Sequence, residues 1–196
     1  NFIELVDALV DDVRKNSGNT IYFWFDMFVN DQLNALDKDF YWWSNTFKTA
    51  VQSIGETVIF LNSWKDPSML KRAWCLYEIS CSEKLSIAIC KKEEESFMHT
   101  MRSDRESIAA NLCKIKLENA TAYLETDRQQ IFNAVEQTKD GFNGFNNIVV
   151  GLIREWIAQS ARNMISSNVD LNSTETFLGK FCHSLALKFC KCVLKK

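Results

Sequence analysis

The residue pair with the clearest chemical potential is Trp74 and Glu78. The two are four residues apart, so they share one face if this segment is a helix. An aromatic ring beside a carboxylate can hold a nucleobase or a sugar. The carboxylate can then stabilise positive charge that develops on a ribose carbon, as in glycoside cleavage. A solvated glutamate beside a core tryptophan gives the same spacing, so both interpretations stay open.

Polar residues also follow two apolar runs. Thr20–Phe25 ends at Asp26, and Thr57–Leu61 is followed by Asn62–Asp66, which contains Ser63. Apolar runs without polar alternation predict strands that are buried on both faces, as in a parallel sheet. Ligands bind beyond the carboxyl ends of such strands, which makes these loops candidate binding segments. A strand-end aspartate often only turns the chain.

Amphipathic patterns predict the helices that position these strands. Apolar residues at three- and four-residue steps indicate helices over 2–15, over the segment from Trp43 through Phe47 and Ala50 to Ile54, and over 70–84. Gly55 is suited to end the second of these helices. Leu85–Cys90 is a third apolar run. The order α-β-α-β-α-β predicts a doubly wound parallel sheet with right-handed crossovers, in which the three strands are neighbours.

The second half of the chain is predicted to be mainly helical. Helices are expected over 93–113, over 127–138 with Asp127 as a cap, and over 145–164 with Ile148, Leu152 and Trp156 toward the sheet. Residues 120–124 suggest a short edge strand. We therefore divide the chain into an α/β domain, 1–165, and a linker with a C-terminal amphipathic helix, 166–196.

Composition limits the classes of function. The 196 residues are 46% apolar and 24% charged, which suits a domain with a sizeable core. A net charge of −2 gives no pull toward nucleic acid, and no apolar run reaches the roughly 20 residues of a membrane span. The seven cysteines form no CxxC pair, so we expect no metal site and reduced thiols in a cytoplasmic protein. We also expect no bound cofactor.

The stretch from Tyr22 to Ile89 resembles the Toll/interleukin receptor (TIR) domain. The most specific part is Arg72–Ile79, Arg-Ala-Trp-Cys-Leu-Tyr-Glu-Ile, which is similar to the Trp-Cys-Leu-x-Glu-Leu helix motif of plant TIR domains. It is more similar to a TIR-like family of protists and algae, attached to tetratricopeptide or other repeat modules. In that family Tyr-Phe-Trp-Phe-Asp, Asn-Asp-Gln and Arg-Ala-Trp-Cys-Leu-x-Glu recur together.

The resemblance implies a flavodoxin-like sheet with helices on both faces and a role in intracellular signalling or innate immunity. It implies one of two activities. Some TIR domains hydrolyse NAD at the nicotinamide–ribose bond, and the resemblance would make Glu78 the catalytic residue, with Asp26, Ser63 and Trp74 around the substrate. Others associate with further TIR-like domains as adaptors. The loop Met27–Asp39 would gate the cleft or mediate assembly. The usual first strand of the family is expected to be missing or to precede this sequence.

Overall fold

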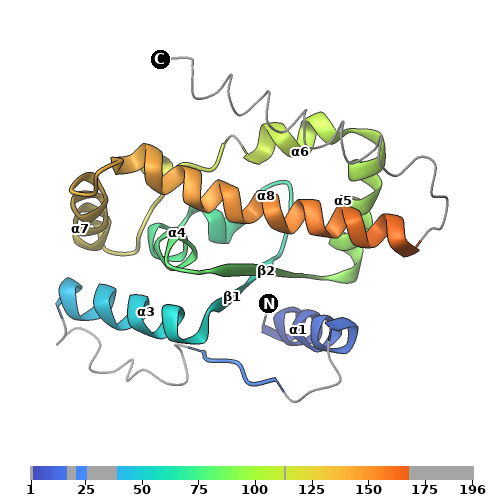
Figure 1. Ribbon diagram of the computed structural model, residues 1–196, viewed down its shortest axis with the longest axis horizontal. Coiled ribbons are helices and arrows are strands. Elements are labelled where there is room, and N and C mark those ends of the chain that lie inside the picture. Colours follow the sequence, from blue (N-terminus) through green and yellow to red (C-terminus); the bar gives the residue numbers. More distant parts are fainter. Residues whose placement is uncertain (1, 17–20, 26–38, 113, 168–196) are drawn as a thin grey trace.

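The computed structural model describes residues 2–16, 21–25, 39–112 and 114–167, and its fold is mixed α/β (Figure 1). The elements run in the order α1 (Phe2–Asn16), α3 (Phe40–Ile54), β1 (Glu56–Leu61), the 3-10 helix η2 (Ser68–Lys71), α4 (Ala73–Ser80), β2 (Lys84–Ile89), α5 (Lys91–Ser103), α6 (Arg105–Leu112), the 3-10 helix η3 (Leu117–Asn119), α7 (Glu125–Glu136) and α8 (Gly141–Ser167).

Two parallel strands form the sheet within the described residues. β1 and β2 pair over their whole length, from Glu56 opposite Lys84 to Leu61 opposite Ile89. The connection between them carries η2 and α4, as parallel strands require a crossover. Two of the three predicted strands and their parallel pairing are therefore confirmed.

The predicted first strand is wrong for the residues that the structure describes. Ile21–Phe25 has no regular secondary structure, and Tyr22 is 88% exposed. An apolar run becomes a strand only when a sheet edge accepts its backbone hydrogen bonds. Here Trp24 instead packs edge-on against Phe47 of α3, with 5.9 Å between ring centroids.

Helices cover both faces of the sheet, and the side chains of the strands alternate between them. Ile59 and Ile87 belong to the main core, which also takes in residues of α4, α5, α7 and α8. Phe60 and Ala88 turn to the other face and pack with Leu9 of α1. Figure 1 shows α8 on one side of the two strands and α1 with α3 on the other. This alternation is the period of two that a strand imposes.

Both ends of α3 are capped, and the predicted end at Gly55 is confirmed. Asp39 caps the first turn, where its Oδ1 accepts a hydrogen bond from the Trp42 amide at 2.8 Å. Gly55 ends the helix at φ 80°, a conformation that favours glycine. Its amide donates to the Val51 carbonyl, and its carbonyl accepts from the Lys84 amide at 3.1 Å. Gly55 therefore joins α3 to the start of the sheet.

The apolar faces of two helices differ from the predicted ones. Ile54, expected toward the sheet, is exposed, and the buried apolar residues of α3 are Phe47 and Val51. On α8, Ile148 is 51% exposed, whereas Ile153 is 3% exposed. The buried face of α8 is the neighbouring stripe that continues through Val149, Ile157 and Ala161.

Three further predictions in the second half are corrected. The helix expected over 93–113 is two helices, α5 and α6, separated at Asp104 with φ −145° and ψ 74°. The edge strand expected over 120–124 is reduced to one isolated parallel bridge between Thr121 and Arg72. The helix expected over 145–164 is longer at both ends, since α8 runs from Gly141 to Ser167. The rest of the predicted linker and C-terminal helix lies outside the described residues.

Candidate functional site

Trp74 lies at the start of α4 and is held by contacts from two other helices and from its own. Its indole Nε1–H donates to Oδ2 of Asp127 at 3.1 Å. Its ring contacts Phe40 and Phe47 of α3, at centroid distances of 5.6 and 5.9 Å, and lies edge-on to Tyr77. The half-buried indole therefore joins α3, α4 and α7.

Glu78 lies one turn further along α4, near the amino-terminal end of the sheet. Its carbonyl accepts a hydrogen bond from Ser82 Oγ at 3.1 Å, and Ser82 Oγ lies 2.5 Å from Oγ1 of Thr57 in β1. Burial raises the pKa of the Cys81 thiol, and the negative charge of Glu78 acts in the same direction. The half-buried Glu78 carboxylate therefore lies close enough to Cys81 for their charges to interact.

Ser63 lies beyond the opposite end of β1. It follows Leu61 by two residues, whereas Glu78 is linked through Ser82 to Thr57, at the start of the strand. The four residue steps from Thr57 to Leu61 span roughly 13 Å of strand. The structure brings Trp74 and Glu78 together on one helix and places Ser63 toward the other end of the sheet. Asp26 and most of the loop Met27–Asp39 lie outside the described residues.

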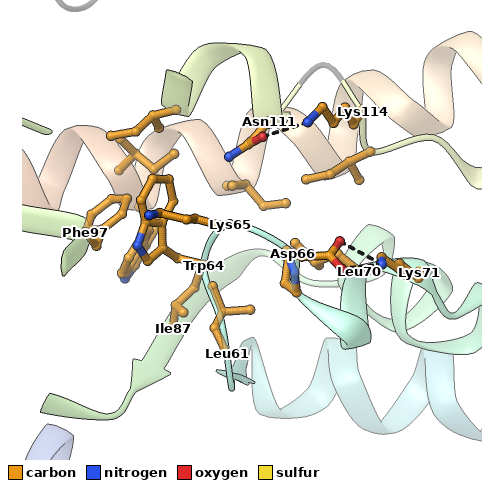
Figure 2. Close-up of a pocket in the computed structure, with 16 residues that line it drawn as sticks. Leu61, Trp64, Lys65, Asp66, Leu70, Lys71, Ile87, Phe97, Asn111 and Lys114 are labelled. Atoms are coloured by element: carbon orange, nitrogen blue, oxygen red, sulfur yellow. Dashed lines mark hydrogen bonds and ion pairs between the residues drawn. The ribbon is translucent and has the colours of Figure 1, made fainter. Parts of the chain in front are cut away.

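A cavity of about 110 Å³ opens beyond the carboxyl ends of the two strands (Figure 2). Its floor includes Leu61 from β1 and Ile87 from β2, and its walls include Phe97 of α5 and Trp156 of α8. Its remaining lining residues come from three places: Trp64, Lys65, Asp66, Pro67, Leu70 and Lys71 after β1, Ile108, Asn111, Lys114 and Ile115 in and after α6, and Ile153 and Ile157 of α8.

The loop after β1 is fixed to α5 through Trp64. The Trp64 amide donates to Oε2 of Glu93, and its indole Nε1–H donates to Oγ of Ser96, both at 3.2 Å. The ring is buried and lies edge-on to Phe97, 5.7 Å between centroids. Both N–H groups of Trp64 are therefore used inside the protein, and its ring forms a firm wall of the cavity.

Lysines dominate the polar part of the cavity lining. Lys71 Nζ lies 2.6 Å from Oδ1 of Asp66. Lys65 Nζ lies 5.4 Å from the centroid of the Trp64 ring, and Lys114 Nζ donates to Oδ1 of Asn111 at 3.0 Å. Three ammonium groups thus share the lining with a single carboxylate, and an anion is the natural complement.

Sequence reasoning found only part of this cavity. It singled out Asn62–Asp66 because the segment follows a buried strand, and Trp64, Lys65 and Asp66 do line the cavity. It missed the contributions of α6 and α8. No local spacing connects Lys114 or Trp156 to this loop, because the fold alone brings them there.

Comparison with protein families, with curated proteins and with solved structures finds no match for this chain. Among the described residues, no group of three or more His, Cys, Asp or Glu side chains is placed to hold a metal ion. None of the helices in the described ranges combines the length and the apolar character needed to cross a membrane.

Proposed function

We propose that this chain is a TIR-like, flavodoxin-like signalling domain of the cytoplasm that acts in innate defence by associating with further copies of itself. The resemblance of Arg72–Ile79 to the TIR helix motif supports the family. So does the position of this motif on the crossover helix between two parallel strands. The observation that carries the association is an aromatic face made of three exposed residues, Tyr22, Trp24 and Trp42, together with the half-buried Trp43.

Ring contacts hold the three tryptophans of the aromatic face, either to one another or to Phe47 of α3. Trp42 lies edge-on to Trp43 at 4.7 Å, Trp43 stacks on Phe47 at 5.7 Å, and Trp24 packs against Phe47 from the 21–25 segment. Trp24 and Trp42 are both exposed, and Tyr22 is nearly fully so. Tryptophan and tyrosine are enriched at protein interfaces, and clustered exposed aromatics mark interaction surfaces.

Light scattering tests this association. The wild-type chain should form dimers or larger assemblies as its concentration rises. Trp42→Ser and Tyr22→Ser should each weaken the association constant by about tenfold, because interface aromatics carry much of the binding energy. Tyr123→Ser is the matched control, since Tyr123 is 100% exposed on the segment before α7. A wild-type chain that stays monomeric at all concentrations refutes this proposal.

Hydrolysis of NAD is the second candidate function, favoured by the half-buried Glu78 on the helix that carries the TIR-like motif. In that reaction the bond between nicotinamide and the ribose carbon breaks and nicotinamide leaves. The oxygen of a water molecule then bonds to the same ribose carbon. The Glu78 carboxylate would stabilise the positive charge that builds on the ribose.

An NAD assay separates the two candidates. Glu78→Gln keeps the shape of the side chain and removes its charge, so turnover should fall by orders of magnitude while the fold survives. Glu83→Gln, a few residues away and exposed, should leave turnover unchanged. Equal turnover in the wild type and in Glu78→Gln excludes Glu78 as the catalytic residue.

A further inference from the structure

The cavity beyond the carboxyl ends of β1 and β2 has the size and lining of a binding site for a small molecule. Its volume, about 110 Å³, approaches that of engineered apolar cavities that bind benzene. Open parallel sheets place their ligands at this end of the strands. The cavity takes no residue from the aromatic face and includes neither Trp74 nor Glu78, so it is separate from both candidate functions.

The inner part of the cavity favours an apolar body. Leu61, Ile87, Phe97 and Ile153 are each less than a tenth exposed, and all face the cavity from different elements. The Trp64 ring closes one wall, and its two N–H groups are already bonded to α5. The part of a ligand that lies in this space is therefore stabilised by burial of its apolar surface. It cannot accept a hydrogen bond from the Trp64 indole, whose N–H is already bonded.

The outer part favours one negative charge. Lys65 and Lys114 are exposed, and neither has a carboxylate partner within the part of the chain that the structure describes. Lys71 is already paired with Asp66. Figure 2 shows the paired Asp66 and Lys71 apart from Lys114, which lies with Asn111 across the cavity. Two ammonium groups are thus available to an anionic head, and a bond to a charged group is stronger than a neutral one.

We propose that this cavity binds a small monocarboxylic acid whose body is about the size of a benzene ring. The body lies among the apolar side chains, and the carboxylate accepts hydrogen bonds from Lys65 and Lys114. No arginine lines the cavity among the described residues. The forked, two-point recognition that arginine gives to carboxylates and phosphates is therefore missing, and the anionic group meets separate ammonium groups instead.

Titration calorimetry with phenylacetate tests the proposal. Two comparison compounds divide the ligand into its parts: phenylacetamide has the body without the charge, and acetate has the charge without the body. Phenylacetate should bind at least about tenfold more tightly than either compound, because only it satisfies both regions of the cavity. No binding of phenylacetate, or equal binding of phenylacetamide, overturns the proposal.

Four variants locate the site. Lys65→Gln and Lys114→Gln should each weaken phenylacetate binding by about tenfold, since each removes one charged donor. Lys116→Gln removes an exposed lysine two residues from Lys114 that does not line the cavity, and binding should not change. Ile115→Trp should fill the cavity and abolish binding, and its unfolding midpoint reports whether the fold survives. Equal weakening by Lys116→Gln, or unchanged binding in both cavity-lysine variants, overturns the proposal.

Discussion

The indole of Trp74 and the carboxylate of Asp127, 53 positions apart in the sequence, join two helices. The bond, 3.1 Å from Nε1 to Oδ2, ties the start of α4 to the first turn of α7. The sequence predicts Asp127 as the cap of its own helix. α7 instead begins at Glu125 after Leu124, and the Asp127 side chain serves this contact between helices. The aromatic residue that suggested a substrate platform therefore has a structural role.

The first prediction measures this contact. Trp74→Phe keeps most of the ring surface and removes the donor, so the free energy of unfolding should fall by about 1 kcal/mol. Asp127→Ala removes the acceptor and should cost a similar amount, and the double variant should cost less than the sum because the two residues share one bond. Urea unfolding of the four proteins gives the coupling energy. Strictly additive costs would contradict the contact.

Two glycines should respond in opposite ways to the same substitution. Gly55 has φ 80°, so Gly55→Ala should lower the free energy of unfolding by about 1–2 kcal/mol, although no atom lies within 4 Å of the added carbon. Gly151 lies inside α8 and is equally open, so Gly151→Ala should raise stability by up to about 1 kcal/mol. Thermal unfolding of both variants checks the pair. A stabilised Gly55→Ala would contradict the left-handed conformation.

The α8 face can be checked with two isoleucines of one helix. Ile153→Ala should cost about 2–5 kcal/mol, because the side chain is almost fully buried in the main core. Ile148→Ala, half exposed, should cost much less, since it leaves no cavity. Denaturant unfolding gives both values. A larger loss of unfolding free energy at Ile148 than at Ile153 would support the buried face through Ile148 that the sequence predicted.

The acid stability of the chain should depend on Glu56. Burial opposes its ionisation, but hydrogen bonds from Lys84 and Ser86 outweigh that effect and lower the pKa of Glu56. Because the pKa of Glu56 is lower in the folded state, its ionised carboxylate stabilises the protein at pH values above the unfolded-state pKa of about 4.3. That contribution is lost as the pH falls through the folded pKa, because the unfolded chain then binds the proton first.

Glu56→Gln should therefore be less stable than the wild type at neutral pH, and the difference should shrink as the pH falls below about 4. Urea unfolding at a series of pH values measures this difference. Glu83→Gln controls for the loss of one negative charge near the same end of the sheet. A difference that grows on acidification would mean that the pKa shift has the opposite sign.

Local signals in the sequence predict the central elements of this fold. Gly55 marks the carboxyl end of α3, and the apolar runs around Ile59 and Ile87 become β1 and β2. The helix depends on a cap only a few residues away in the sequence. Each strand depends on a partner that is separated from it by a single crossover. These are the features that composition and period report directly.

Features that depend on distant segments could not be predicted in this way. The run Ile21–Phe25 has strong strand propensity, but pairing requires an edge that the sequence does not specify. On α8, two adjacent apolar stripes begin at Ile148 and Val149, and only packing against the sheet chooses between them. The cavity likewise depends on side chains such as Lys65 and Lys114, which are 49 positions apart in the chain.

The pairing of β1 with one neighbour has a consequence for hydrogen exchange. The bond from the Lys84 amide to the Gly55 carbonyl, with the register of the sheet, directs the amides of Thr57, Ile59 and Leu61 toward β2. The intervening amides of Val58 and Phe60 point to the outer edge, which pairs with no strand in the described ranges. The amides of Val58 and Phe60 should therefore exchange with deuterium faster than those of Thr57, Ile59 and Leu61. If two chains paired through this edge, exchange at Val58 and Phe60 alone would slow.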